Sequence, residues 1–104
     1  MRKYIRLLVS CLIVFGLSGA SADETAASKG ERIYDKSCSQ CHGDDLQNNS
    51  SIAFDLRRLR AEEHSRFVDS VLHGKRAMPS WEGALTMEQI ENLWAYIRMR
   101  AYQR

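Results

Sequence analysis

The sequence predicts an all-α fold of three to five helices in a single small domain. Three stretches, at about 25–39, 62–73 and 86–101, place apolar residues three and four positions apart, the period of a helix buried on one face. No run alternates apolar and polar residues as a half-buried strand does. With 104 residues, the chain has room for one domain.

The first 22 residues have the three parts of a secretory signal peptide. Basic residues begin the chain, an apolar run covers 7–17, and small residues follow as far as Ala22. The run is too short to cross a bilayer, which takes about 20 residues. We therefore expect cleavage after Ala22, export to the periplasm, and a mature domain of residues 23–104 that does not insert into the membrane.

Cys11 offers a different way of processing the same segment. It follows Leu-Val-Ser, which is similar to the lipobox of bacterial lipoproteins. Cleavage there would leave the apolar residues 12–17 at the start of the mature chain. We keep lipid attachment as the alternative to cleavage after Ala22.

Removal of the leader changes the charge of the chain. Three of the 15 Lys and Arg residues and none of the 13 Asp and Glu residues lie in it, so the mature chain carries 12 basic against 13 acidic residues. Nucleic-acid binding requires a clustered basic face, and the sequence shows none. We therefore expect no nucleic-acid partner.

The first predicted helix runs from Thr25 or Ser28 to Ser39. Gly30 lies on its apolar stripe, four residues before Tyr34. A glycine inside a helix costs about 1 kcal/mol relative to alanine, so we expect it to permit a close crossing by another helix. The alternative is that Gly30 simply begins the helix.

The sequence Cys-Ser-Gln-Cys-His at 38–42 predicts a c-type haem attachment site. Thiols three positions apart, at Cys38 and Cys41, share one face of a helical turn, where both can form thioethers with the vinyl groups of one haem. His42 can then ligate the iron through a neutral imidazole. The alternatives are a redox-active dithiol, which would need a βαβ context, and half of a zinc site, which would need a second ligand pair.

Residues 43–51 are mostly polar and predict a loop. Leu56 and Leu59 predict a helical turn with both side chains facing inward. The second long helix should open with two acidic residues that suit the helix dipole, and should end at Gly74 as an αL cap. The two acidic residues are Glu62 and Glu63. The apolar stripe of this helix is Phe67, Val68, Val71 and Leu72.

After a loop over 75–85, Thr86 should begin the last helix. Thr86 and Gln89 have the spacing of a capping box. The predicted buried stripe of this helix is Ile90, Leu93, Trp94, Ile97 and Ala101.

Met78 is the predicted second axial ligand of the iron. It lies in the 75–85 loop, 36 residues after His42, and Pro79 fixes the backbone that follows it. Thioether sulfur is a soft ligand suited to a haem iron. Trp81 either donates to a haem propionate or packs the loop. The other candidate ligands are Met87, which begins a capped helix, Met99, expected to fill the core, and the surface histidines His64 and His73.

With these motifs in order, the sequence resembles the class I bacterial cytochromes c, small carriers with a single haem. The resemblance covers nearly all of residues 26–102. It implies a bundle of helices around one covalently attached haem c, in which Gly30 and Tyr34 cross the last helix at Leu93 and Tyr96. It implies a non-enzymatic, monomeric electron carrier with His42 and Met78 as axial ligands.

Two details refine the resemblance. The stretches 54–58 and 78–81 are similar to members that serve periplasmic quinoprotein alcohol or methanol dehydrogenases, so such an enzyme, and a terminal oxidase or another cytochrome, are the expected partners. The family usually has a proline whose carbonyl accepts from the proximal histidine. Ala53 or Phe54 takes that place here.

The rival functions are a fixed subunit of a larger redox complex and a haem enzyme or sensor with an open sixth position.

Overall fold

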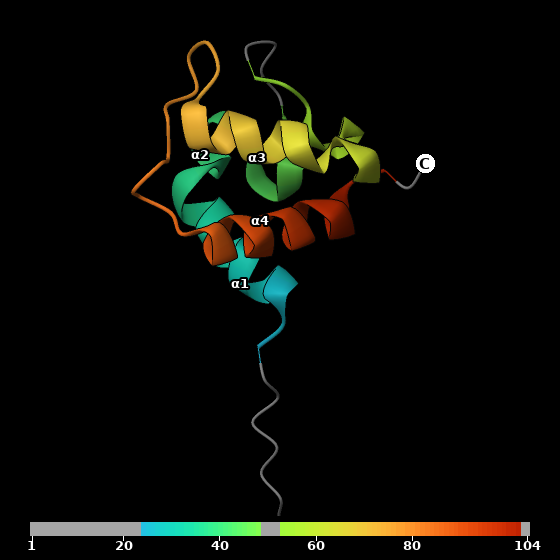
Figure 1. The fold of residues 1–104 in the computed structure, drawn as a ribbon. Helices are drawn as coiled ribbons and strands as arrows, with labels where there is room; N and C mark the ends of the chain where they lie inside the picture. Colours follow the sequence, from blue (N-terminus) through green and yellow to red (C-terminus); the bar gives the residue numbers. More distant parts are fainter. Residues whose placement is uncertain (1–23, 49–52, 103–104) are drawn as a thin grey trace, which may run out of the picture.

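The computed structural model describes residues 24–48 and 53–102 (Figure 1). Its α-helices are α1 (Ala26–Ser37), α2 (Ser39–His42), α3 (His64–His73) and α4 (Met87–Arg100). Single-turn 3₁₀ helices lie between them: η1 (Asp44–Leu46), η2 (Leu56–Arg58) and η3 (Ala61–Glu63).

The described residues form isolated bridges but no strand, so the all-α prediction is confirmed. The predicted signal peptide, including Cys11 and Ala22, lies outside these residues, as does part of the predicted loop at 49–51. Among the described helices, none is long and apolar enough to cross a membrane.

Helix α1 begins where its cap predicts. The hydroxyl of Thr25 accepts a hydrogen bond from the Ser28 backbone N–H at 3.1 Å. The helix ends two residues earlier than expected, because Cys38 leaves helical geometry (φ −122°, ψ −33°) and the chain turns into the separate short helix α2.

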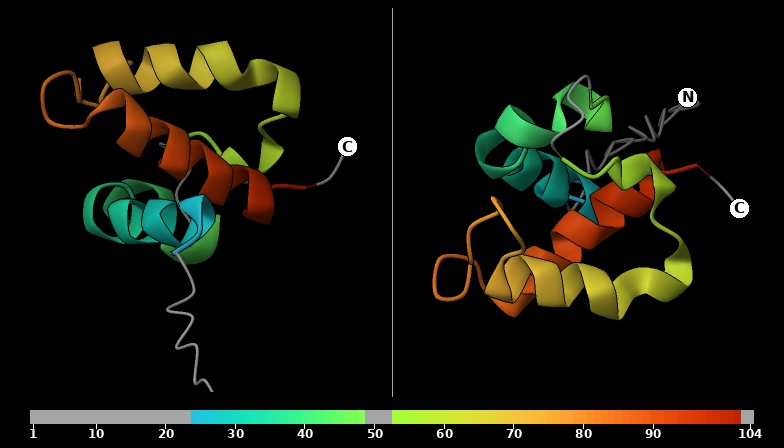
Figure 2. Two further views of the ribbon diagram at one scale, coloured as in Figure 1. Left: turned by 60° about the horizontal axis from the view of Figure 1, so that its bottom comes forward. Right: turned by 90° about the horizontal axis from the view of Figure 1, so that it is seen from above.

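Helix α4 lies between α1 on one side and α3 on the other (Figure 2). It crosses α1 at Gly30, which confirms the predicted close approach and rules out Gly30 as the helix start. The rings of Tyr34 and Tyr96 pack at the same crossing, with their centroids 5.2 Å apart. The contact between α1 and the last helix that the family resemblance implied is therefore present.

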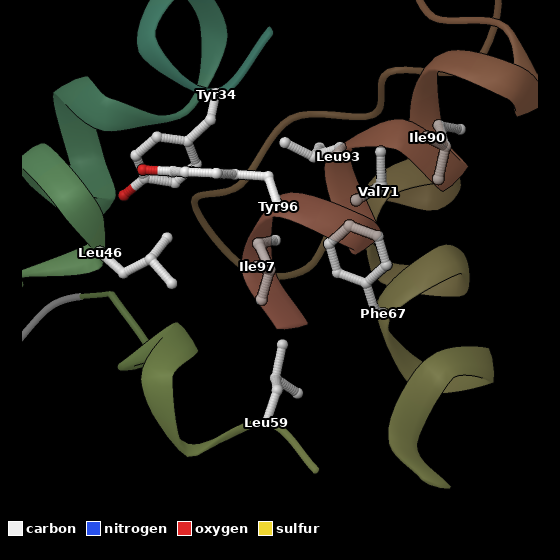
Figure 3. Close-up of a cluster of buried hydrophobic side chains, with 9 residues drawn as sticks. All are labelled: Tyr34, Leu46, Leu59, Phe67, Val71, Ile90, Leu93, Tyr96 and Ile97. Carbon is white, nitrogen blue, oxygen red and sulfur yellow. The ribbon is translucent and has the colours of Figure 1, made fainter. Parts of the chain in front are cut away.

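The core is built from α1, η1, α3, α4 and the residue Leu59 between η2 and η3 (Figure 3). Its members are at most 6% exposed: Tyr34, Leu46, Leu59, Phe67, Val71, Ile90, Leu93, Tyr96 and Ile97. Burying a side chain of this size contributes about 1.5–3 kcal/mol relative to leaving it in water. Through Tyr34 and Leu46, this shared core fixes the elements before and after α2 relative to α4.

Helix α3 differs in detail from the prediction. Glu62 and Glu63 form the 3₁₀ turn η3 and do not belong to its first turn. Gly74 ends the helix with a positive φ of 75°, but its ψ of 168° is extended, so the predicted αL cap is wrong. The stripe is confirmed, with Phe67 and Val71 buried.

Helix α4 has the predicted capping box. The Thr86 hydroxyl accepts from the Gln89 N–H at 3.1 Å, and the Gln89 side chain accepts from the Thr86 N–H at 2.8 Å. Met99 is 55% exposed, so its predicted place in the core is wrong. Ala101 is buried just beyond the helix end.

Candidate haem attachment site

The two motif cysteines lie at the ends of one helical turn. The Cys38 carbonyl accepts from the N–H groups of Cys41 (3.2 Å) and His42 (3.0 Å), which closes the turn of α2. Cys38 is half-buried against the core, whereas Cys41 is exposed. Burial, with a smaller effect of Cys41, raises the pKa of the Cys38 thiol to about 11, so before attachment this thiol is neutral at physiological pH.

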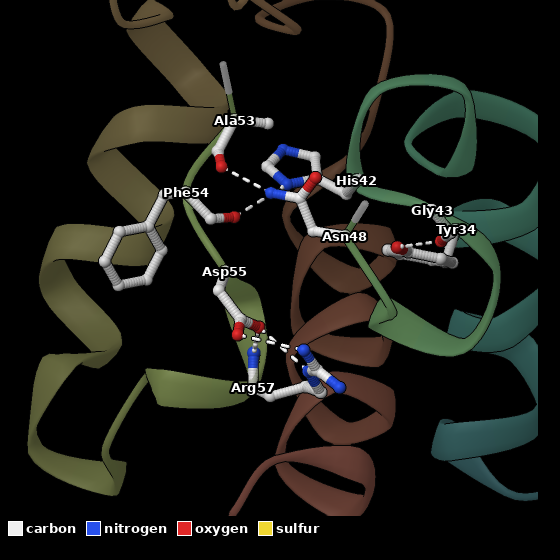
Figure 4. Close-up of polar contacts among 8 residues, drawn as sticks. All are labelled: Tyr34, His42, Gly43, Asn48, Ala53, Phe54, Asp55 and Arg57. Atoms are coloured by element: carbon white, nitrogen blue, oxygen red, sulfur yellow. Dashed lines mark hydrogen bonds and ion pairs between the residues drawn. The ribbon is translucent and has the colours of Figure 1, made fainter. Parts of the chain in front are cut away.

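His42 is held by the segment that follows the polar loop (Figure 4). Its Nδ1 lies 3.1 Å from the carbonyl oxygen of Phe54. A carbonyl can only accept, so Nδ1 carries the proton and Nε2 keeps a lone pair that can bind a metal. Burial lowers the pKa of His42, and the bond to Phe54 opposes that shift in part. The imidazole is therefore neutral, the form in which histidine ligates iron.

Gly43 allows the chain to leave the motif. Its φ is 82°, and a Cβ at this position would come within 2.1 Å of the Gln47 carbonyl oxygen. The hydroxyl of Tyr34 donates to the Gly43 carbonyl at 2.5 Å. Desolvation raises the pKa of this phenol, so it remains a donor. The turn is thereby attached to α1.

The loop that carries Met78 is folded tightly after α3. Lys75 and Met78 exchange two backbone hydrogen bonds, at 3.1 and 3.0 Å, around a two-residue turn in which Arg76 has φ 56°. Farther along, the Trp81 N–H donates to the Val71 carbonyl at 2.8 Å. The loop therefore folds back over the C-terminal end of α3.

Gly74 makes that folding possible. A Cβ at Gly74 would lie 2.6 Å from the Met78 carbonyl oxygen and 2.9 Å from the Ser80 nitrogen. Met78 itself is partly buried and packs against the core. In each view, this loop and the α2 turn lie on the same side of the molecule (Figures 1 and 2). The structure thus brings the motif and the Met78 loop to one side of the bundle.

The other candidate ligands have different surroundings. Nε2 of His64 lies 2.9 Å from both Glu91 carboxylate oxygens, and His73 lies within 3.8 Å of Asp69 and Glu82. Met87 and Met99 are at least half exposed. None of these four side chains lies in the Met78 loop.

Trp81 is partly buried and packs against the core. Its indole N–H makes no hydrogen bond with the described part of the chain. The packing role is therefore observed, and the N–H remains available for a polar group of a ligand.

The sequence did not predict the polar contacts that hold the segment at 53–57. The Asn48 side-chain amide donates to the Ala53 carbonyl, and Arg57 pairs with Asp55 at 3.0 Å. The Arg66 guanidinium lies 4.9 Å from the centroid of the Phe54 ring. A polar loop gives no periodic signal for such contacts, so residue spacing could not have revealed them.

The fold and this donor set define a c-type cytochrome: two thiols and an imidazole on one turn, with Nε2 available, fit a covalently bound haem. A family model described as cytochrome c oxidase, cbb3-type, subunit III, matches residues 25–97. The chain belongs to this family of cytochrome c domains, whose cofactor is haem c.

Relatives of two sizes match the chain. The quinohemoprotein alcohol dehydrogenase ADH-IIG of Pseudomonas putida is 36% identical over 79% of this chain, which spans 12% of that enzyme. The CcoP subunit of the cbb3-type oxidase of Azospirillum brasilense is 26% identical, and the chain spans 32% of it. The chain therefore covers well under two thirds of these relatives. By contrast, it spans 96% of the cytochrome c6 of Gloeothece citriformis, at 29% identity over 97% of this chain.

A solved structure shows the same fold. The quinohemoprotein alcohol dehydrogenase ADHIIG from Pseudomonas putida HK5 superimposes with a TM-score of 0.65 and 34% sequence identity over 78% of this chain. The match covers 12% of the enzyme's chain. The predicted fold, and the resemblance to cytochromes c, are confirmed.

Proposed function

We propose that residues 1–22 are a signal peptide and that the mature chain, 23–104, is a periplasmic one-electron carrier. In this proposal Cys38 and Cys41 hold haem c, and His42 and Met78 ligate its iron. When bound, haem c supplies an iron that alternates between Fe(II) and Fe(III). The protein forms and breaks no bond in a substrate.

The observation that carries the proposal is the hydrogen bond from His42 Nδ1 to the Phe54 carbonyl, on the turn that holds both cysteines. A histidine that donates through Nδ1 has its tautomer and ring orientation fixed, and its Nε2 becomes a stronger donor to a metal. This geometry supports the proposal that His42 is the proximal ligand.

Met78 is proposed as the opposite ligand because its loop is rigid and lies on the same side as α2. The exchange of hydrogen bonds with Lys75 and the close packing at Gly74 limit the movement of its backbone. His/Met ligation raises the reduction potential, which suits an electron carrier. A closed sixth position also leaves no site for a substrate or gas.

Optical spectra of the exported protein, with and without CO, test this ligation. We expect a low-spin spectrum, a weak far-red Fe(III)–methionine band, and little CO binding to the reduced protein. Met78→Ala should remove the band and permit rapid CO binding, whereas the matched variant Met99→Ala should behave as the wild type. A wild-type protein that is high-spin and binds CO at once would support the open-site enzyme or sensor instead.

The proposed partners are redox proteins that dock transiently near Met78. Lys75 and Arg76 are exposed beside it and form no ion pair with the described part of the chain. A quinoprotein alcohol dehydrogenase is proposed as an electron donor, and a terminal oxidase or another cytochrome as an acceptor. This rests on the matches to ADH-IIG and CcoP. We propose a monomer that binds no nucleic acid.

A second candidate function is a fixed subunit of a larger redox enzyme. It is favoured by the relatives in which a matching region forms 12% or 32% of the chain. The full-length match to cytochrome c6 favours a free carrier. Size-exclusion chromatography of the native periplasmic extract separates the two: a free carrier elutes as a small monomer, and a fixed subunit elutes with a large enzyme.

A further inference from the structure

Two consecutive carbonyl groups attach one short segment to the haem-binding turn and to the loop that follows it (Figure 4). The Ala53 carbonyl accepts from the Asn48 side-chain amide, and the Phe54 carbonyl accepts from His42 Nδ1 at 3.1 Å. Asn48 and Ala53 stand on either side of residues 49–52 in the sequence, so their bond joins the loop that follows α2 to the segment that supports His42.

This segment has few other constraints. Ala53 and Phe54 belong to no helix or strand, and neither is a proline. The Phe54 ring is 41% exposed, and its described partner is the Arg66 guanidinium on α3. Ring packing therefore fixes the Phe54 backbone weakly, and hydrogen bonds to the backbone must contribute more.

Asn48 binds the Ala53 carbonyl, one residue before the Phe54 carbonyl that accepts from His42. The Ala53 carbonyl and the Phe54 N–H share one planar peptide unit, so holding that carbonyl fixes the whole plane. The Phe54 carbonyl is separated from the plane by the φ and ψ of Phe54 alone. Without the bond from Asn48, the plane can rotate, and the carbonyl moves relative to Nδ1 of His42.

We propose that Asn48 is a positioning residue for the proximal ligand: its amide fixes the Ala53–Phe54 peptide and so keeps the Phe54 carbonyl aligned with His42 Nδ1. It takes the part that a rigid proline would otherwise have. The proposal rests on the function proposed above, since it requires His42 to ligate iron.

The consequence concerns the electronic character of the ligand. A strong hydrogen bond at Nδ1 increases the basicity of the imidazole, which stabilises Fe(III) relative to Fe(II). A weaker bond should raise the reduction potential. It should also let the Nδ1 proton exchange faster with solvent, because the bond opens more often.

The test compares Asn48→Leu, which keeps the size but removes the donor, with Asn48→Gln, which keeps an amide, in the haem-loaded protein. Gln47→Leu is the control, because the Gln47 side chain is exposed and makes no hydrogen bond with the described residues. NMR of the reduced protein measures exchange of the His42 Nδ1 proton, and redox titration measures the potential.

We expect Asn48→Leu to speed the exchange roughly tenfold, the effect of losing one hydrogen bond of typical net strength, and to raise the potential. Asn48→Gln should lie closer to the wild type, and Gln47→Leu should match it. If Asn48→Leu does not accumulate, Asn48→Ala takes its place. Unchanged exchange and potential, even with lower stability, would overturn the proposal, as would equal effects of the Leu and Gln variants.

Failure of the proposed function would look different. A wild-type protein whose spectrum shows no low-spin histidine ligation removes the premise before any variant is compared. A wild type with normal His/Met spectra, together with unaltered Asn48 variants, rejects the positioning role and leaves the electron carrier in place.

Discussion

The backbone carbonyl of Asn92 occupies the space that a side chain on Gly30 would need. A Cβ built on Gly30 would lie 1.9 Å from the carbonyl oxygen of Asn92 and 2.9 Å from the nitrogen of Leu93. These atoms belong to the backbone of α4, so neither can move aside by changing a rotamer. The two helices would have to separate, and the Tyr34–Tyr96 packing at the crossing would change with them.

Gly30→Ala should therefore destabilise the protein, although alanine favours a helix. Overpacking costs about 1–3 kcal/mol, and the gain in helix propensity, up to about 1 kcal/mol, offsets part of this. Chemical denaturation of the haem-loaded protein measures the difference. Lys29→Ala, an exposed change on the same helix, should stay within about 0.5 kcal/mol of the wild type. A Gly30→Ala variant as stable as Lys29→Ala would contradict the crossing.

Gly74→Ala should weaken the Met78 loop specifically. Two effects combine there, a positive φ of 75° and a contact of 2.6 Å with the Met78 carbonyl oxygen. Gly83→Ala provides a matched control, because Gly83 has φ 79° but nothing within 4 Å of its Cβ position. We expect each variant to lose about 1–3 kcal/mol from backbone strain, because alanine rarely adopts a positive φ.

Only in Gly74→Ala does the new Cβ also press against the Met78 carbonyl oxygen, so only this variant should disturb the Met78 loop. In alkaline titrations followed by the far-red Fe(III)–methionine band, the band should disappear at lower pH in Gly74→Ala than in the wild type. In Gly83→Ala the titration should be unchanged. Equal titrations for both variants would show that the close packing at Gly74 does not support Met78.

Local patterns predicted those features that depend on local geometry. Residue spacing predicted the helices, and the capping-box spacing of Thr86 and Gln89 predicted where the last helix begins. A glycine on an apolar stripe predicted the crossing at Gly30. The cysteine and histidine spacing likewise predicted a shared turn. The helices, the cap and the shared turn depend on residues within a few positions of one another, where sequence and structure are closely coupled. The crossing brings Gly30 against the distant Asn92, but the small residue that permits it is visible on its own helix.

Features that depend on distant contacts were missed. Leu46 is fully buried with φ 63°, yet it lies among polar residues and had no periodic partner in sequence. Met99 lies on helix α4, but its side chain is 55% exposed. The sequence left two candidates, Ala53 and Phe54, for the carbonyl that accepts from His42, and in the structure it is Phe54. Tertiary packing decides each of these outcomes.

Glu63 should contribute stability that depends on pH. Its carboxylate accepts from the Arg60 N–H at 2.8 Å and from Arg66 at 2.9 Å, and the Arg60 hydrogen bond is the main cause that lowers the pKa of Glu63 from about 4.5. A group whose pKa is lower in the folded state stabilises that state above its unfolded pKa. The contribution disappears as the pH falls through the folded pKa.

Thermal denaturation of Glu63→Gln should therefore show a lower Tm than the wild type near neutral pH. The two proteins should converge as the carboxyl becomes protonated in acid. Glu62→Gln is the control, since Glu62 is exposed and lies 4.0 Å from Arg60 without a backbone bond. A Glu63→Gln deficit that persists unchanged in acid would contradict the assignment.

Lys75 should attract negatively charged redox partners to the Met78 side of the protein. It is exposed and next to the loop turn, so its charge acts through solvent and is screened by salt. At low ionic strength, Lys75→Gln should react with hexacyanoferrate, an anionic oxidant, roughly two- to threefold more slowly than the wild type in stopped-flow measurements. Lys29→Gln makes the same charge change on α1, away from this loop, and should react at nearly the wild-type rate. The difference between the two variants should vanish at high salt; a difference that survives there would mean that Lys75 affects the haem site itself and does not steer the encounter.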